Sequence, residues 1–451
     1  MKLLGLLIAA LLLAGLSGLV YWSNQREKAN EGKPDPDAAP KIIEVEKETL
    51  ARIEIQKTGE PALTLEKGED GKWKVTAPEA LRADESAVDS LVSALSHLSS
   101  NRLIAESAAD LSPFGLDQPK LTVVARQKDG KEIKLLVGDE TPTSGNYFVK
   151  REDDPRVFTL ASWNKTSLEK SPWDLRDKRL LTYDADKLSR VALRAKGQTL
   201  EIGKNANNEW AIVGPKPFRA DGGAVEQLLS RLRDARMDTQ MSAEEMKKAA
   251  ATFAKAKPVA TAQVTDAAGS QEIEVRKAGD NEYYAKSSAV EGIHKITSFV
   301  GEGLDKGLDD LRNKKLFDFG FNDPNRIEIR AAGKVYKFEK KDDKWVKDGK
   351  QMDSVSVRAL IDELRDLAAQ SFPESGFTDA AIEAKVVSDD GKRVEEVAMA
   401  KSGDSYIARR ANEPSLYELK AVDVDRLQAR AEEVKEHQES SEQKEKEKKK
   451  E

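Results

Sequence analysis

Three segments that end in tryptophan decide the fold: LTLEKGEDGKW at 63–73, LEIGKNANNEW at 200–210 and YKFEKKDDKW at 336–345. In each segment a short strand-like run leads into a polar turn. Their tryptophans, Trp73, Trp210 and Trp345, stand 137 and 135 residues apart. Recurrence at a nearly fixed spacing indicates a tandem array of one structural unit. We therefore predict three repeats whose tryptophans occupy equivalent, buried positions.

An amphipathic helix is predicted behind each tryptophan. Apolar side chains recur there at spacings of three and four residues, which places them on one face of a helix. The predicted buried stripes are Val88, Leu91, Val92, Leu95 and Leu98; Val225, Leu228, Leu229 and Leu232; and Val357, Leu360, Ile361, Leu364 and Leu367. Asp84, Asp221 and Asp353 precede these helices, where an aspartate side chain accepts hydrogen bonds from unpaired amide groups.

Strand patterns flank each helix. Residues 52–55 alternate between polar and apolar, and similar runs stand at 190–193 and 326–329. Behind the helices come further strands, with Asp129-Gly130 and Asp390-Gly391 at hairpin positions. A Gly-Asp pair then precedes a tyrosine strand three times, at Gly138-Asp139, Gly279-Asp280 and Gly403-Asp404. Antiparallel hairpins packed by helices predict an α+β unit.

Two closely similar motifs set the repeat boundaries. DLRDKRLL begins at Asp174 and DLRNKKLF begins at Asp310, 136 residues later. We place the repeats at 41–179, 180–316 and 317–430. Each repeat is expected to contain a strand meander, an amphipathic helix, a second meander and a short helix.

The two ends of the chain differ from the repeats. Leu3 to Trp22 carries no charge, and its roughly 20 residues suffice for a helix across a membrane, so residues 1–22 are a predicted transmembrane anchor. A cleaved signal peptide with Gly15-Leu16-Ser17 as its site is the alternative. Residues 23–40 are a polar linker, and residues 431–451 a charged tail. The expected location is the bacterial inner membrane, single-pass, with the bulk on the periplasmic or extracytoplasmic side.

Composition narrows the function. The 74 basic and 80 acidic residues are mixed along the chain, which argues against a nucleic-acid partner. The absence of cysteine excludes disulfides and thiolate metal sites. His97, His294 and His437 stand at positions that do not correspond between repeats, and no phosphate loop, serine elbow or zinc motif occurs. We expect no catalytic residues, no metal site and no cofactor.

Three aromatic residues are candidates for binding a partner. Phe114 stands between polar turn residues, where a loop is normally hydrophilic; the alternative is that it packs back on the core. Trp163 and Trp173 flank a short predicted helix outside the repeated tryptophan position. They are suited to a contact surface for a partner or glycan, or to filling the seam between the first and second repeats.

The segment from Ser112 to Pro119, followed by Val137-Gly138-Asp139 and by Ser171 to Arg176, resembles a bacterial family called domain of unknown function 4340. The likeness extends more weakly over residues 41–430. The resemblance implies a single-anchor envelope protein, often encoded beside gliding-motility-type ABC transporter permeases. It supplies no catalytic residues. The second repeat has TFAKAKPVA in place of the Phe-Gly-Leu loop, which puts any shared role of that loop in question.

Two functions follow as hypotheses. The first is a non-enzymatic accessory or scaffold protein of an envelope ABC transport complex, with a permease as its protein partner. The second is an envelope hydrolase or glycan-binding protein with its site in one repeat. Genes for a permease and an ATPase beside this one would favour the first hypothesis.

Overall fold

The computed structural model describes residues 40–143, 145–206, 208–411 and 413–438. The predicted anchor and all of the linker except Pro40 lie outside these residues. Within the described ranges, no helix combines the length and the apolar character that a membrane crossing requires. The chain forms two compact units that divide between Lys178 and Arg179.

The described residues form three antiparallel sheets of nine, eight and eight strands, so the α+β prediction with antiparallel meanders is confirmed. The first sheet has the order β4-β3-β2-β1-β6-β7-β8-β9-β5. Its strands are β1 (Leu50–Lys57), β2 (Leu63–Lys67), β3 (Trp73–Ala77), β4 (Leu81–Arg82), β5 (Arg102–Ala105), β6 (Leu121–Gln127), β7 (Glu132–Glu140), β8 (Asn146–Arg151) and β9 (Val157–Ala161).

The second and third sheets repeat this plan in the second unit. The second runs β13-β12-β11-β10-β14-β15-β16-β17 and the third β21-β20-β19-β18-β22-β23-β24-β25. The strands of the second sheet are β10 (Arg190–Ala195), β11 (Gln198–Lys204), β12 (Trp210–Gly214), β13 (Phe218–Arg219), β14 (Lys257–Asp266), β15 (Gly269–Gly279), β16 (Glu282–Ser287) and β17 (Ile293–Ile296). Those of the third are β18 (Arg326–Ala331), β19 (Lys334–Lys341), β20 (Lys344–Lys347), β21 (Lys350–Gln351), β22 (Ile382–Ser388), β23 (Arg393–Ser402), β24 (Ser405–Arg410) and β25 (Leu416–Lys420).

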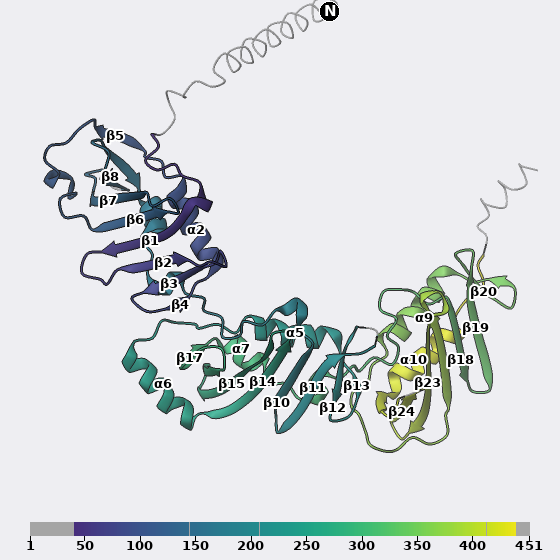
Figure 1. The fold of residues 1–451 in the computed structure, drawn as a ribbon. Coiled ribbons are helices and arrows are strands. Elements are labelled where there is room, and N and C mark those ends of the chain that lie inside the picture. Colours follow the sequence, from purple (N-terminus) through teal and green to yellow (C-terminus); the bar gives the residue numbers. More distant parts are fainter. Residues whose placement is uncertain (1–39, 144, 207, 412, 439–451) are drawn as a thin grey trace, which may run out of the picture. The chain divides into compact units, whose positions relative to one another are not determined.

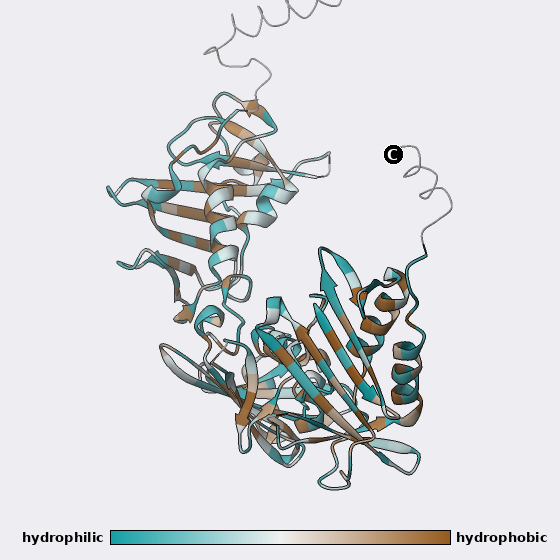
Figure 2. Cartoon of the chain, turned by 90° about the vertical axis from the view of Figure 1, so that its right-hand side faces the viewer, coloured by the Kyte–Doolittle hydropathy of each residue, from teal (hydrophilic) through white to brown (hydrophobic). Residues whose placement is uncertain are grey.

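The main helix of each repeat packs against the apolar face of its sheet. The first repeat has α2 (Glu85–Ser96), α3 (Ser162–Leu168) and α4 (Pro172–Leu175); the second has α5 (Gly222–Arg233), α6 (Ala243–Lys255), α7 (Ser298–Gly303) and α8 (Leu308–Leu311); and the third has α9 (Ser354–Asp366) and α10 (Ala421–Glu432). Helix α6 of the second repeat lies against the opposite face of its sheet, where Phe253 meets Tyr284. In the third repeat α9 and α10 lie side by side on the sheet (Figure 1). Hydrophobic and hydrophilic residues alternate along the strands, so one face of each sheet is apolar (Figure 2). Short 3-10 turns are η1 (Lys47–Thr49), η2 (Ser112–Phe114), η3 (Ala185–Lys187) and η4 (Asp389–Gly391).

The helix predictions are confirmed. Every residue of the three predicted apolar stripes is buried. The carboxylates of Asp84, Asp221 and Asp353 accept hydrogen bonds from the amides three residues later at 3.0, 2.9 and 2.8 Å. Burial of four or five aliphatic side chains stabilises each helix on its sheet by about 1.5–3 kcal/mol per side chain.

Each repeat is closed by a short segment that pairs with the residues just before its main helix. In the first repeat the amide of Asp84 donates to Leu175 O at 2.8 Å, and the amide of Asp177 donates to Arg82 O at 2.8 Å. The second repeat makes the same pair of bonds from Asp221 to Leu311 and from Asn313 to Arg219, at 2.8 and 2.9 Å. The DLR motifs and the helix-opening motifs are therefore two halves of one interaction.

The third repeat closes in the same way, and this corrects the predicted start of the charged tail. The amide of Asp353 donates to Lys435 O at 2.8 Å, and that of His437 donates to Gln351 O at 2.9 Å. Ala431 is buried in α10, and Val434 packs against the core. The boundary at residue 430 is therefore too early, because backbone pairing orders a segment whose side chains are mostly charged.

The repeated tryptophans occupy equivalent positions but differ in burial. Trp73 and Trp210 begin β3 and β12, pair with Lys67 and Lys204, and have those lysines over their rings at 5.9 and 5.4 Å. Trp345, in β20, pairs with Lys340 of β19. Only Trp345 of the three is buried, at 9% exposure, whereas Trp73 and Trp210 are half-buried. The prediction of three core tryptophans is thus wrong for Trp73 and Trp210.

Candidate functional site

The loop that carries Phe114 packs back on the first sheet. Its ring lies edge-on to Phe148 of β8, with the centroids 5.0 Å apart, and is half-buried. Leu116 in the same loop is buried at 1% exposure. The contacts of Phe114 are those of a side chain that holds its own loop in place, and they account for an apolar residue in a polar connection.

A glycine in β7 makes this packing possible. A side chain at Gly138 would lie 2.1 Å from Phe114 O and 2.9 Å from Gly115 C, so only hydrogen fits there. Gly115 itself has φ 61°, a left-handed conformation that favours glycine. Lys120 then ties the end of the loop to Asp139 with an ion pair of 2.9 Å. The Phe-Gly-Leu and Gly-Asp motifs are therefore two sides of one backbone contact.

The three Gly-Asp pairs are not equivalent, contrary to the sequence pattern. Gly138 lies inside β7 at a bulge between Val137 and Glu140. Gly279 and Gly403 stand instead at tight turns, in which Asn281 has φ 56° and Gly403 has φ 60°. The three dipeptides look alike because a close approach of two main-chain segments and a tight turn both favour glycine.

Trp163 and Trp173 have different surroundings. Trp163 is the second residue of α3, and 69% of its surface is exposed. Trp173, in α4, is half-buried, with the ammonium group of Lys178 5.0 Å from its ring centroid. The first therefore presents a large apolar surface to solvent, whereas the second is partly covered.

An exposed apolar side chain recurs at the position of Trp163 in every repeat. Tyr147, Tyr283 and Tyr406 pair with Leu160, Ile296 and Leu419 on the neighbouring strand. Three residues beyond these partners stand Trp163, Phe299 and Val422, exposed at 69%, 55% and 60%. We call these three residues the helix-start row. One side of Phe299 is covered by the guanidinium of Arg231, 3.4 Å from its ring centroid.

The second repeat has an added helix, with a hollow near the end of that helix. Helix α6 stands where the first repeat has its Phe-Gly-Leu loop, and it buries Ala249 and Phe253 in a small separate cluster. A hollow of about 680 Å³ lies near its end, lined by Arg194, Lys257 and Glu302 among others. Ala260 lines it, at the position that strand pairing gives to Leu121 and Ile382 in the other repeats. Charged side chains make up nearly half of the residues that line it, whereas small-molecule sites usually have only a few polar groups.

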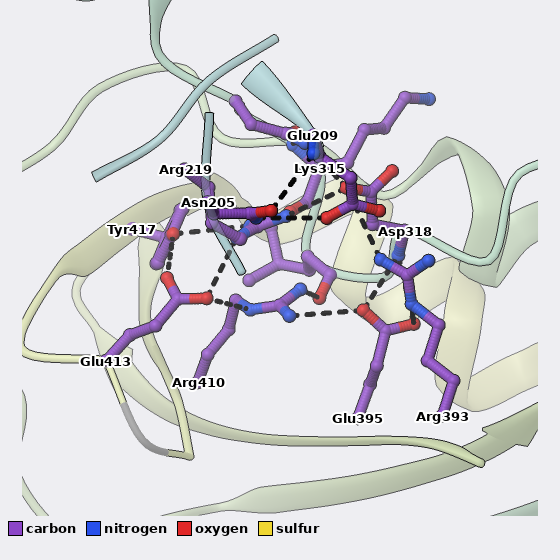
Figure 3. A network of polar contacts seen from close by, with 12 residues as sticks. Asn205, Glu209, Arg219, Lys315, Asp318, Arg393, Glu395, Arg410, Glu413 and Tyr417 are labelled. Carbon is purple, nitrogen blue, oxygen red and sulfur yellow. Dashed lines mark hydrogen bonds and ion pairs between the residues drawn. The ribbon is translucent and has the colours of Figure 1, made fainter. Parts of the chain in front are cut away.

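A polar network joins the second and third repeats within the second unit (Figure 3). Arg219 of β13 reaches Glu413 with its Nε at 2.8 Å and donates from Nη2 to the Tyr417 hydroxyl at 3.3 Å. It also donates to Lys315 O at 2.5 Å. Arg410 holds the same Glu413 at 2.8 Å and Glu395 at 3.1 Å. Arg312 lies between two aromatic rings, 4.3 Å from Phe218 and 3.7 Å from Phe372.

Burial shapes the protonation of this network. Burial lowers the pKa of Arg219, but its electrostatic interactions with Tyr417 and Glu413 outweigh this effect, so the pKa of Arg219 is raised overall. The pKa of Tyr417 is raised by burial, and Glu413 adds to the effect. The guanidinium of Arg219 therefore stays charged and Tyr417 stays neutral, as a permanent structural ion cluster requires.

The histidines remain separate from one another. His97 and His437 are exposed, and His294 is buried with its Nε2 2.9 Å from Glu291 O. Among the described residues, no three histidine, aspartate or glutamate side chains form a group that could hold a metal ion.

A family model matches residues 73–213 and again residues 210–391, under the description domain of unknown function (DUF4340). The chain belongs to this family. The matches begin at Trp73 in β3 and at Trp210 in β12, so each match starts in the middle of a sheet and not at its first strand in the chain. No curated protein and no solved structure matches the chain.

Proposed function

We propose that this DUF4340 chain is a non-enzymatic accessory or scaffold protein of the bacterial envelope, associated with an ABC transport complex. One N-terminal helix anchors it in the inner membrane, and the repeats lie on the periplasmic or extracytoplasmic side. A transporter permease is the proposed partner. The anchor rests on the roughly 20 uncharged residues from Leu3 to Trp22, enough for a helix across the hydrocarbon core.

The helix-start row is the observation that carries the proposal. A single exposed apolar side chain is ordinary on a protein surface. Three at the same register, each more than half exposed, repeat one contact point in three copies of the fold. Aromatic and aliphatic residues in such positions bury large apolar areas when a protein partner covers them. Tandem repeats can offer several such points to one partner.

Affinity purification from gently solubilised membranes tests the proposal. The full-length chain is compared with a variant in which Trp163→Ser, Phe299→Ser and Val422→Ser are combined. A matched control combines Phe321→Ser, Val335→Ser and Val394→Ser, since these side chains are also exposed, at 97%, 49% and 51%, but stand outside the row.

We expect the wild-type chain and the control to recover a permease, and the row variant to lose it. If all three chains recover the permease, the helix-start row is not part of the interface. If no membrane transport component is enriched with the wild-type chain, the scaffold proposal itself fails.

A further inference from the structure

The third repeat contains a socket for an arginine of the second repeat. The socket consists of the Tyr417 ring and the carboxylate of Glu413, four residues earlier. The guanidinium carbon of Arg219 lies 5.9 Å from the ring centroid, and its Nε lies 2.8 Å from the carboxylate. Glu413 also accepts from the Tyr417 hydroxyl at 2.6 Å, which fixes its orientation.

The first repeat has the same socket and fills it with its own arginine. Strand pairing makes Phe158 the equivalent of Tyr417, and Asp154 precedes it by four residues as Glu413 precedes Tyr417. Arg156 lies 5.0 Å from the Phe158 ring centroid. Its Nη2 and Nε contact Asp154 at 2.6 and 3.0 Å. Ring, acid and guanidinium are all present, but the guanidinium comes from within the repeat.

One residue position distinguishes the two arrangements. It stands two residues before the socket ring, where the first repeat has Arg156. The third repeat has Ser415 there. The second repeat has Gly292, but its ring position is His294 and its acid position is Val290, so it has no complete socket. The second and third repeats thus carry a small residue at this position, whereas the first repeat carries an arginine.

The residues that correspond to Arg219, the arginine that enters the socket, show the complementary pattern. The backbone pairs that close each repeat make Arg82, Arg219 and Gln351 equivalent. They likewise make Arg176, Arg312 and Glu436 equivalent. The two repeats that another repeat follows have arginine at both positions, and the third has arginine at neither.

We propose that these substitutions close the three-repeat array at both ends. Arg156 occupies the socket of the first repeat, and Gln351 and Glu436 remove the guanidinium groups from the outer edge of the third. Neither a further repeat nor a second copy of this chain can then join through the joint seen between the second and third repeats. A head-to-tail joint would otherwise be free to propagate into open filaments. This inference does not depend on the proposed function.

The first experiment tests whether Arg219 holds the joint. Because the chain has no cysteine, Lys247→Cys in the second repeat and Asp404→Cys in the third introduce two unique sites for spin labels. Arg219→Ser is expected to broaden the label-to-label distance distribution. Arg276→Ser is the matched control, since Arg276 also pairs a carboxylate, Glu274 at 2.6 Å, and a ring, but inside one repeat. A distribution as narrow as in the wild type, or equal broadening in the control, would overturn the role of Arg219.

The second experiment reopens both ends in the full-length chain. Arg156→Ser copies Ser415, and Gln351→Arg with Glu436→Arg restores the donor residues. We expect the triple variant to self-associate about tenfold or more tightly than the wild type in detergent sedimentation, because hydrogen bonds to charged groups are gained.

Arg156→Ser alone and the donor pair alone are expected to sediment as the wild type does. If the triple variant sediments as the wild type at every concentration while its melting shows a folded chain, closure of the ends by these residues is refuted. Should Arg156→Ser prevent folding, Arg156→Gly, which copies Gly292, replaces it in the same comparison.

Discussion

Gly138→Ala is the sharpest test of how the Phe-Gly-Leu loop is held. The added methyl group would stand 2.1 Å from Phe114 O and 2.9 Å from the Gly115 carbonyl carbon, both of them main-chain atoms. Ordinary contacts of this kind begin at about 3.4 Å, so the loop must move by roughly 1 Å or leave the sheet. Gly138 has no left-handed backbone requirement, so alanine tests the contact alone.

The cost can be bounded in two ways. A loop that stays and strains costs about 1–3 kcal/mol, the usual range for overpacking. A loop that leaves exposes Leu116, which is 1% exposed in the fold, and forfeits about 1.5–3 kcal/mol of apolar burial. Either route predicts that the free energy of unfolding falls by about 2 kcal/mol and that the melting temperature of the first unit falls by roughly 4–8 °C.

Calorimetry measures the loss, and hydrogen exchange locates it. Faster exchange is expected at residues 111–119 and 137–140. Gly279→Ala is the control, because it alters the same dipeptide where an added methyl group meets only the Glu282 side chain at 3.5 Å. Unchanged melting and loop protection in Gly138→Ala, or an equal loss in Gly279→Ala, would refute the packing argument.

Three further predictions follow from burial. Phe114→Ser is expected to lower the free energy of unfolding by about 1–2 kcal/mol, since the half-buried ring loses its edge contact with Phe148. An unchanged melting temperature would contradict this and support a role of Phe114 in binding a partner. Trp345→Ala should cost about 3–5 kcal/mol and Trp210→Ala clearly less, as denaturant unfolding would show. Burial raises the pKa of Tyr183 to about 12 from 10.0, and its hydroxyl has no hydrogen-bond partner. Because the raised pKa favours the neutral form in the fold, stability is full below pH 10 and falls as the pH rises through 12. Tyr183→Phe should therefore stabilise the chain by up to about 1 kcal/mol at neutral pH and remove that alkaline loss; equal melting temperatures of variant and wild type at neutral and alkaline pH would contradict this.

The sequence carried enough information to predict the repeats and their main helices. A helix with one buried face needs apolar side chains at spacings of three and four, and a polar cap at its start. Both signals are local, so Asp84 and the stripe behind it could be recognised without knowing the rest of the fold. The same holds for the turn glycines Gly130 and Gly391, whose φ values are 88° and 91°.

Features set by distant contacts were missed. The bond from Asp177 to Arg82 links two motifs that are far apart in the chain, so neither motif revealed its partner. Segment 432–438 was assigned to a tail because its side chains are charged, whereas its order comes from backbone pairing. Helix α6 did leave a local signal, since Ser242 and Glu245 form a capping box. The repeat comparison obscured it, because the other repeats have no helix there.

The aromatic candidates show why exposure could not be predicted from sequence. Phe114, Trp163 and Trp173 are all large residues near turns, yet only Trp163 has most of its surface exposed. Its distinguishing feature is its register, three residues beyond the strand partner of Tyr147. That register became visible only when the strands were paired, and it then identified Phe299 and Val422 as well.

In the second unit, the helix-start row and the joint between the second and third repeats use different residues. Arg219, Glu413 and Tyr417 are largely buried, and removing one partner of such a buried ion pair costs about 3–5 kcal/mol. They therefore specify which repeat lies next to which. Phe299 and Val422 take no part in that joint and keep more than half of their surfaces exposed. A partner that binds the row can do so without competing with the joint. Loss of the row should for this reason leave melting unchanged while removing the partner, and loss of Arg219 should loosen the joint while the row stays exposed.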